Sequence, residues 1–337
     1  MRIDTYTHFI PKQFLQKMER IGDQKDIGMR MRAIPAIYDL DVRKKVVDAF
    51  ADYAQILSYP MPPLEHFAKP NELEDLCRTI NDGFAELCGK ESDRFPGWVA
   101  QASLASPDAG VRETERAIKN GAVGVQIYTN VNGKPLDRPE FEPFFAAMNK
   151  LGKPIWIHPT RGANHPDYLD EKKSLYEIWW AFGWSYETAA AAARLVFSKT
   201  LDKYSNLKII LHHFGGIIPM LEGRIGPGWD QLGARTSDED YVSLRKSLKK
   251  RPLDYFQQDF YVDSAAFGGR GATLCGLEFY PRDKIIFASD CPFDPEKGPG
   301  YIRETIKILD SLDIPKERRD AIYYKNFEAL TGRQFVK

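Results

Sequence analysis

Short apolar segments rich in β-branched residues recur along the chain, and each is followed by a turn and then by a longer helical pattern. Strands that alternate with helices in this way are typical of βα units. Eight such units in one chain favour a closed (β/α)8 barrel of the TIM type over an open, doubly wound sheet. We expect strands at residues 2–6, 54–58, 98–103, 122–128, 155–158, 207–212, 260–264 and 284–289.

Turn and helix signals support this alternation. A serine-proline pair at 106–107 offers an N-cap and a proline at the first helical position, and Asn-Gly at 120–121 would end that helix. The alanine-rich segment 185–204 predicts another helix. The segment 11–40 is too long for an ordinary connection, so we expect an insertion after the first strand, near the barrel mouth. The whole chain, 1–337, is otherwise expected to be a single barrel domain.

Side chains that can bind a metal fall at the carboxyl ends of four expected strands, where a barrel places its active site. Imidazole and carboxylate are the usual zinc ligands and also suit manganese and iron, and three protein ligands leave a position open for catalysis. Each histidine alone has an ordinary alternative as a hydrogen-bonded core or loop residue. Their joint position favours a metal site. The four ends are Tyr6-Thr7-His8, Ile157-His158-Pro159, Leu211-His212-His213 and Ala288-Ser289-Asp290.

Composition narrows the function. Acidic and basic side chains are equal in number, 47 each, which argues against a nucleic-acid partner or a polybasic membrane anchor. The sequence has neither a signal-peptide pattern nor an apolar run long enough to cross a bilayer, so we expect a cytoplasmic protein. The four cysteines have no CxxC spacing and are expected to be reduced.

Four motifs follow one another along the chain: IDTYTHFIP, IWIHP, HHFGGIIPMLEGRI and IIFASDCPFDP. Together they resemble the motifs of the amidohydrolase-2 family, and the resemblance covers essentially the whole chain. Described members of that family include aminocarboxymuconate-semialdehyde decarboxylase and γ-resorcylate decarboxylase. The resemblance implies a (β/α)8 barrel of the metal-dependent hydrolase type that holds one divalent ion, usually zinc or manganese.

The motif positions of the family fall on particular residues of this chain. The second histidine of the opening HxH motif is His8, the mid-chain metal histidine is His158, and the metal aspartate is Asp290. The catalytic histidine of the family precedes a glycine pair as H-x-G-G, and this register selects His213. His212 would then point to the opposite side of the strand, or lie beside the ligands as a neighbour.

Two positions depart from the family pattern. Tyr6 stands where the family has the first histidine of HxH, and it is a weak metal ligand, a hydrogen-bond donor to substrate, or a packing residue. The bridging lysine of two-metal amidohydrolases is absent from the expected fourth strand, AVGVQIYT. That absence weakens the case for a standard binuclear hydrolase.

The implied reaction is the non-oxidative decarboxylation of a small aromatic or muconate-like carboxylate. One divalent ion would bind the substrate carboxylate, His213 would deliver the proton, and Asp290 would act as metal ligand and proton partner. An arginine fork suits a carboxylate, and the resemblance places one in the insertion, at Arg30 or Arg32. Aromatic residues in the segment WWAFGWSYE, with Trp184, form either a substrate wall or core.

Three alternatives remain open. Tyr6, His212 and Glu187 offer further donors, and a second ion bridged by Glu187 would give a dinuclear iron or manganese-iron oxygenase. Glu187 also has a structural explanation, as a carboxylate in the first turn of a helix capped by Ser185. With Asp290 as base toward metal-bound water, the protein would be a hydrolase of a lactone or amide. The third alternative is a non-catalytic subunit of a heteromeric enzyme. For an enzyme, we expect a small-molecule carboxylate substrate and a homodimer.

Overall fold

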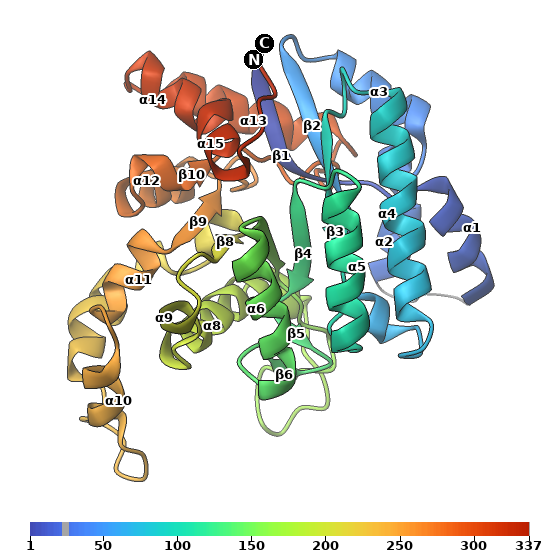
Figure 1. Cartoon of the computed structure of the whole chain (residues 1–337). Coiled ribbons are helices and arrows are strands. Elements are labelled where there is room, and N and C mark those ends of the chain that lie inside the picture. Colours follow the sequence, from blue (N-terminus) through green and yellow to red (C-terminus); the bar gives the residue numbers. More distant parts are fainter. Residues whose placement is uncertain (22–26, 337) are drawn as a thin grey trace.

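The computed structural model describes residues 1–21 and 27–336, and it shows a barrel of parallel strands surrounded by helices (Figure 1). Neighbouring strands pair in parallel in the order β1-β2-β3-β4-β7-β8-β9-β10. The ring is nearly closed, because Thr5 N donates to Phe287 O (2.9 Å) and His8 N to Cys291 O (2.8 Å). The expected (β/α)8 fold is confirmed. The strands are β1 (Arg2–His8), β2 (Tyr53–Ser58), β3 (Gly97–Gln101), β4 (Gly124–Tyr128), β7 (Pro154–His158), β8 (Lys208–Leu211), β9 (Phe260–Asp263) and β10 (Ile285–Ile286).

All eight expected strands are present, with small shifts at their ends. The largest shift is in β10, which ends early because Phe287 N donates to Ile322 O rather than to a neighbouring strand. A short antiparallel hairpin of β5 (Asn130–Val131) and β6 (Lys134–Pro135) follows β4.

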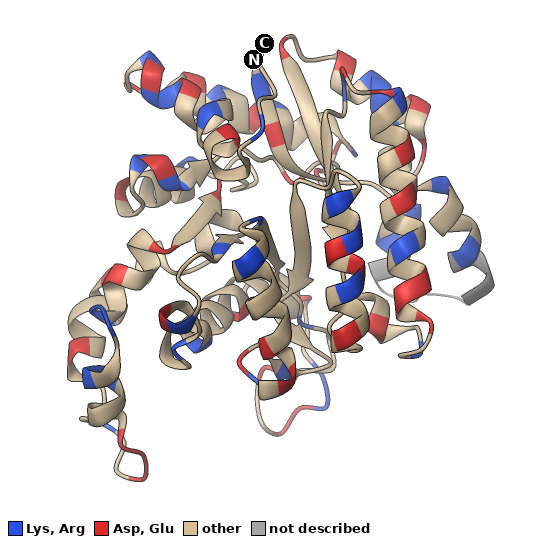
Figure 2. Cartoon of the chain, viewed as in Figure 1, with Lys and Arg blue, Asp and Glu red and all other residues tan. Residues whose placement is uncertain are grey.

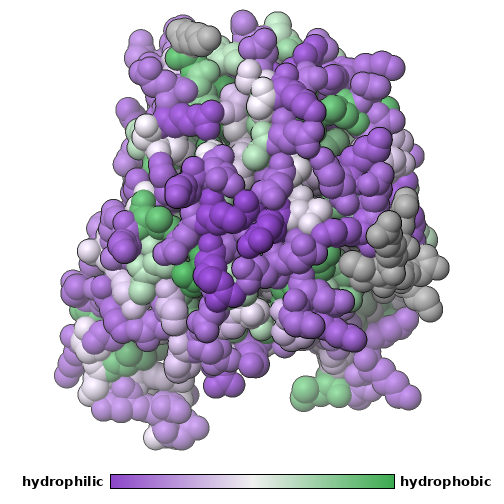
Figure 3. Space-filling view, turned by 45° about the vertical axis from the view of Figure 1, so that its right-hand side comes forward, coloured by the Kyte–Doolittle hydropathy of each residue, from purple (hydrophilic) through white to green (hydrophobic). Residues whose placement is uncertain are grey.

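The helices lie outside the strands and carry most of the charged residues, while the strands carry few (Figure 2). On the face drawn in Figure 3, hydrophilic side chains predominate and hydrophobic ones form small, separate patches. No helix within the described residues is long and apolar enough to span a membrane. The helices are α1 (Lys12–Ile21), α2 (Ile27–Arg32), α3 (Leu40–Asp48), α4 (Leu73–Lys90), α5 (Pro107–Lys119), α6 (Glu142–Leu151), α7 (Ile178–Ala181), α8 (Gly183–Phe197), α9 (Thr200–Lys203), α10 (Tyr241–Ser247), α11 (Pro252–Gln258), α12 (Arg270–Phe279), α13 (Pro299–Asp310), α14 (Lys316–Asp320) and α15 (Asn326–Thr331).

The expected insertion after β1 contains α1 and α2, and its residues 22–26 lie outside the described residues. Two details of the helix predictions were wrong. The segment 185–204 is two helices rather than one, because Lys199 between α8 and α9 takes a left-handed φ of 65°. Ser185 lies inside α8 and therefore does not cap it, so Glu187 is not in the first turn.

The barrel interior is apolar toward the amino ends of the strands and polar at their carboxyl ends. Aromatic rings fill this apolar part: the ring of Trp156 stacks on that of Tyr6 (6.2 Å) and meets that of Phe327 edge-on (6.1 Å), and Phe335 stacks on Phe327 (5.0 Å). The register of β1 is irregular between Asp4 and Thr7, so its interior side chains do not alternate strictly along the strand. Tyr6 thus lies at the boundary between the apolar floor and the polar rim.

Asp4, which also belongs to β1, is fully buried. Its carboxylate accepts hydrogen bonds from Tyr53 Oη (2.6 Å), from Ser289 N (3.0 Å) and from Ser289 Oγ. Burial raises the pKa of Asp4 to about 7, although these hydrogen bonds act in the opposite direction. Asp4 therefore anchors the chain directly before Asp290 at a cost that depends on pH.

We expect the Asp4→Asn variant to remove a pH dependence of stability. Between the ordinary aspartate pKa near 4 and about 7, folded Asp4 keeps a proton that the unfolded chain releases. The unfolding free energy of the natural protein should therefore fall as pH rises through this window and stay level at higher pH. The fall is at most about 1.4 kcal/mol for each unit by which the folded and unfolded pKa values of Asp4 differ. Urea unfolding of both proteins across the window measures the difference. A difference that is constant with pH would contradict the assignment.

Candidate active site at the carboxyl ends of the strands

Five polar residues meet at the carboxyl rim of the barrel because their strands are parallel. His8 ends β1, His158 ends β7 and Asp263 ends β9, while His212 directly follows β8 and Asp290 follows β10. All five are buried. Residues that are far apart in the sequence thus share one small region.

The three metal ligands expected from the sequence lie next to one another. His8 Nε2 lies 2.9 Å from Asp290 Oδ1, and the imidazole rings of His8 and His158 have centres 5.5 Å apart. Asp290 has a left-handed φ of 64°, an uncommon conformation for a residue other than glycine that turns its side chain at the strand end. The arrangement is suitable for a divalent cation bound by two imidazoles and a carboxylate.

Each histidine at the rim has its Nδ1 atom against an oxygen. Nδ1–H bonded to such an oxygen leaves the lone pair of Nε2 on the other side of the ring, free for a metal or a proton. The oxygens are Ser58 Oγ (3.1 Å) and Tyr59 O (3.3 Å) for His8, Pro159 O (2.6 Å) for His158, Asp263 Oδ2 (2.5 Å) for His212 and Ala265 O (2.8 Å) for His213.

The electrostatics of the rim favour neutral imidazole at His158. Burial lowers the pKa of His158 well below its usual value, and the neighbouring His212 and His8 lower it further. A neutral ring has a free lone pair, so His158 is in the form that binds a metal at pH 7.

The side chains of His212 and His213 do not point to opposite sides, as they would along a regular strand. His212 does not point away from the barrel: it is buried, and its ring centre lies 3.7 Å from that of Tyr6. His213 has a left-handed φ of 55°, which interrupts the extended backbone. Consecutive side chains alternate only along an extended strand, so the turn at His213 brings both rings to the rim.

Asp263, which the sequence reasoning missed, holds the double histidine. Its Oδ1 accepts from the backbone N of His213 (3.0 Å) and of Ala265 (3.1 Å), and its Oδ2 lies beside the ring of His212. Burial raises the pKa of Asp263, but the two histidines and the backbone bond outweigh burial and leave the pKa lowered. Among the described residues, His212, His213 and Asp263 form a compact group whose possible ligand atoms lie within 4.8 Å of one another. The available signal was an acidic residue at the end of the expected strand 260–264.

Tyr6 is fully buried, and its hydroxyl donates to Gln126 Oε1. Gln126 Nε2 in turn donates to Gln101 Oε1 (3.0 Å) and Tyr128 Oη (3.1 Å). Burial raises the pKa of Tyr6 well above its usual value, with a further contribution from the carboxylates of Asp290 and Asp263. Of the three roles that the sequence allowed, this structure favours packing with an internal hydrogen bond.

Trp184 and Glu187 lie on α8 at the edge of the rim. The ring of Trp184 is 5.8 Å from that of His158, and its Nε1 donates to Arg161 O (3.1 Å). Glu187 pairs with Arg161 Nη1 at 3.0 Å, an arginine that sequence reasoning did not select. Phe182 is largely exposed, whereas Trp184 is partly buried, packs against the core and has its ring beside that of His158.

The two candidate arginines of the insertion differ in position. Arg30 Nη2 donates to Phe293 O (2.6 Å), and its guanidinium lies over the Phe293 ring at 5.6 Å. That ring is 5.2 Å from the ring of His8. Arg32 accepts a hydrogen bond from Tyr38 Oη at its backbone oxygen (3.4 Å). Arg30 is thus connected to the rim through one residue.

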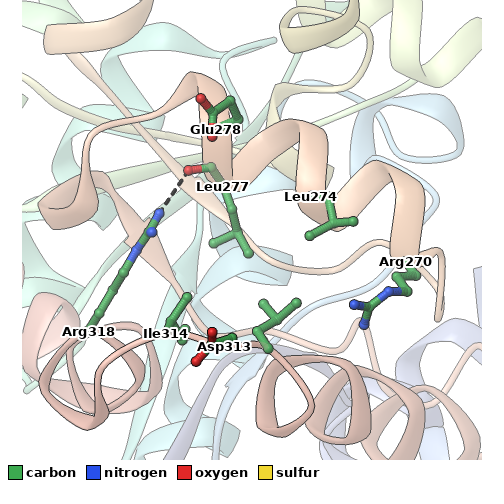
Figure 4. Close-up of a pocket in the computed structure, with 8 residues that line it drawn as sticks. Arg270, Leu274, Leu277, Glu278, Asp313, Ile314 and Arg318 are labelled. Atoms are coloured by element: carbon green, nitrogen blue, oxygen red, sulfur yellow. Dashed lines mark hydrogen bonds between the residues drawn. The ribbon is translucent and has the colours of Figure 1, made fainter.

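A surface pocket of about 260 Å³ lies elsewhere, on the outer helices (Figure 4). It is lined by residues of α12 and of the segment 312–318, and Arg318 Nη2 donates to Leu277 O across it (2.9 Å). The pocket contains neither histidine nor a strand end, so we do not assign the chemistry to it.

The residues of the rim fit a divalent cation. Within the described part of the chain, both ring nitrogens of His212 and the Oδ2 atom of Asp263 are buried without a geometrically sound hydrogen bond, although Nδ1 and Oδ2 are in contact. Buried polar atoms normally have partners, and an unpaired one marks a missing water, ion or ligand. Nitrogen and carboxylate oxygen together are the donor set of zinc, manganese and iron sites.

Comparison with known proteins agrees with this geometry and confirms the resemblance. Gamma-resorcylate decarboxylase of Rhodococcus jostii is 32% identical over 266 residues, which are 75% of this chain and 77% of that protein. The 2-amino-3-carboxymuconate-6-semialdehyde decarboxylase of Dictyostelium discoideum is 26% identical over 325 residues, 91% of this chain and 86% of that protein.

A solved structure supports the same relationship. The crystal structure of dihydroxybenzoic acid decarboxylase from Polaromonas sp. JS666, with bound manganese and the inhibitor 2-nitroresorcinol, aligns with a TM-score of 0.78 and 25% identity, over 98% of this chain and 96% of that one. The family model described as amidohydrolase matches residues 3–332. The chain therefore belongs to the amidohydrolase family.

Proposed function

We propose that the chain is a metal-dependent carboxy-lyase that removes CO2 from a small aromatic or muconate-like carboxylate without oxidation. The observation that carries the proposal is the arrangement of the rim: a histidine-carboxylate cluster around His8, His158 and Asp290, with the separate imidazole of His213 beside it. Relatives across most of the chain are decarboxylases of aromatic and muconate-type acids. The first requirement of the reaction is a cation site, and the second is a proton donor.

His8, His158 and Asp290 would hold one divalent ion, manganese or zinc. When bound, such an ion supplies Lewis-acid chemistry toward a carboxylate and a neighbouring oxygen. His213 would deliver a proton to the ring carbon from its Nε2 atom, because Nδ1 is occupied by Ala265 O. The bond from that carbon to the carboxylate then breaks, CO2 leaves and the proton takes its place. Asp290, in contact with His8, would act as ligand and proton partner.

The wall and the rim arginine would position the substrate. Trp184 presents its ring beside His158 and suits a flat aromatic acid. Arg30 would bind an anionic oxygen of the substrate, because its guanidinium offers a bidentate fork.

We expect the Arg30→Met variant to raise KM for the carboxylate roughly 10- to 100-fold with a smaller change in kcat, as is typical when a hydrogen bond to a charged group is lost. Arg32→Met is the matched control and should leave KM close to its normal value. Steady-state kinetics of both variants measures the difference. An equal effect of the two substitutions would show that Arg30 has no special role.

The direct test of the function is CO2 release by the purified enzyme supplied with manganese or zinc. The substrates are 2,6-dihydroxybenzoate, other hydroxybenzoates and carboxymuconate semialdehydes. Release of one CO2 per molecule of acid, without consumption of oxygen, supports the proposal. Turnover of lactones or amides, with no CO2 from any of the acids, would instead identify a hydrolase.

A dinuclear iron or manganese-iron oxygenase is a second candidate, favoured by one observation. His212, His213 and Asp263 form a compact donor group next to the first cluster. Glu187, the bridge that the sequence suggested, forms an ion pair with Arg161. About two iron or manganese ions per chain, together with oxygen consumption, would favour this candidate, and about one ion per chain would favour the carboxy-lyase.

We further propose that the enzyme is a cytoplasmic homodimer. Large hydrophobic side chains are exposed close together in the sequence, at Tyr168, Leu169, Tyr176 and Phe182. Exposed apolar residues that are grouped in this way often belong to a protein interface. Light scattering coupled to size-exclusion chromatography gives the mass in solution.

A further inference from the structure

The hydroxyl of Tyr6 is already used inside the barrel. It donates to Gln126 Oε1, and Gln126 continues into a network with Gln101 and Tyr128. The ring of Tyr6 stacks on Trp156 with an interplanar angle of 9°. A phenol held in this way by packing and by a hydrogen bond is not available as a metal ligand, so the centre lacks the donor that the first position of HxH would supply.

His212 has the opposite problem, a donor without a partner. Its side chain is about 1% exposed, its Nδ1 atom lies against Asp263 Oδ2, and its Nε2 atom has no hydrogen-bond partner among the residues that the structure describes. Its ring lies 3.7 Å from that of Tyr6 and 5.3 Å from that of His158. A buried imidazole is costly unless its nitrogens are satisfied. His212 therefore lies next to the unfilled position, with a nitrogen to offer.

Asp263 determines which nitrogen of His212 is free. The Oδ1 atom of Asp263 is taken by two backbone N–H groups, and its Oδ2 atom lies 2.5 Å from His212 Nδ1. Two donors on one ion, each at about 2.0–2.2 Å, are roughly 3 Å or more apart, so an ion does not fit between these two atoms. Asp263 is instead placed as the carboxylate that orients a ligating histidine through Nδ1. The free atom is Nε2.

We infer that His212 is a ligand of the metal centre through Nε2, in place of the residue missing at Tyr6, and that Asp263 is its positioning residue. The inference rests on the proposed metal centre of His8, His158 and Asp290. Imidazoles that share one ion with bonds of about 2 Å have ring centres roughly 5 Å apart. The ring of His158 lies 5.5 Å from that of His8 and 5.3 Å from that of His212, so both neighbours are at this spacing.

The inference is tested by metal binding rather than by activity. The full-length protein and its variants are loaded with manganese or zinc, dialysed against graded chelator and assayed by elemental analysis. We expect His212→Ala to weaken metal affinity at least 10-fold, and Asp263→Asn to weaken it about 10- to 100-fold, as is usual when the orienting partner is lost. Asn keeps the acceptor for the backbone of His213 and replaces the acceptor oxygen that faces His212 Nδ1 with an NH2 donor. Tyr6→Phe should bind metal like the natural protein.

A spectroscopic measurement covers the case in which an alanine variant does not fold. Cobalt-substituted His212→Gln, with its fold checked by circular dichroism, should change its visible absorption relative to the natural protein, whereas His213→Gln should not. Unchanged affinity and an unchanged cobalt spectrum in the His212 variants would overturn the inference. If His158→Ala still loses its metal in that experiment, the proposed function stands. If both His8→Ala and His158→Ala keep their metal, the proposed centre itself is wrong.

Discussion

Replacing His158 by alanine is expected to abolish metal retention and to lower kcat/KM by roughly 10³-fold or more, which corresponds to about 4 kcal/mol of transition-state stabilisation. His158 ends β7, is buried, and has the rings of His8 and His212 as neighbours on either side. Burial keeps its imidazole neutral, so the natural protein has a ligand in its binding form at pH 7.

Elemental analysis and CO2 release together measure this prediction. Asp290→Asn should behave like the His158 variant, because an amide oxygen is a much weaker ligand than a carboxylate. His66→Ala is the matched control: His66 lies in the short 3-10 helix Leu64–His66 and is not one of the proposed ligands, so its replacement should change neither metal content nor rate. A His158 variant that keeps a full complement of metal would show that the cation binds elsewhere.

The parts of the site that could be predicted from the sequence are those set by topology. Parallel strands bring their carboxyl ends to one rim, so His8, His158 and Asp290 could be placed together from their positions at expected strand ends. In the structure, contacts of His8 with Asp290 and with His158 join these residues. Alternating strand and helix patterns were sufficient for this step because each strand is short and buried.

The parts that could not be predicted depend on single backbone torsions. His212 and His213 both reach the rim because His213 takes a left-handed conformation, and a run of two histidines gives no sign of it. Asp263 is one of 47 acidic residues and gains its role only through contacts with the double histidine. The role of Arg161 could not be predicted either, since its partners Glu187 and Trp184 lie on α8, which begins only at Gly183.

Replacing His213 by asparagine is expected to lower kcat by about 10²- to 10⁴-fold, the usual contribution of a general acid, while the metal content stays that of the natural protein. The backbone N of His213 is held by Asp263 and its Nδ1 by Ala265 O, so Nε2 is the atom presented for proton transfer. The ring lies 5.1 Å from that of His212 and 4.7 Å from that of Phe267, and it is less buried than His212. His213 can therefore exchange its proton with solvent between turnovers.

The paired His212 variant separates proton transfer from metal binding. If His213 is the acid, the His213 variant retains metal and loses turnover, and added imidazole should restore part of the rate to His213→Ala because the small ring can enter the space that is left. His212→Ala should lose metal affinity first, and excess metal rather than imidazole should restore its rate. The opposite result is an active His213 variant and a His212 variant that is inactive even with its full complement of metal. That result would reverse the roles assigned to the two histidines. The proton donor would then be the deeply buried ring of His212, with Asp263 behind it, and the glycine pair would mark a position one residue beyond the catalytic one.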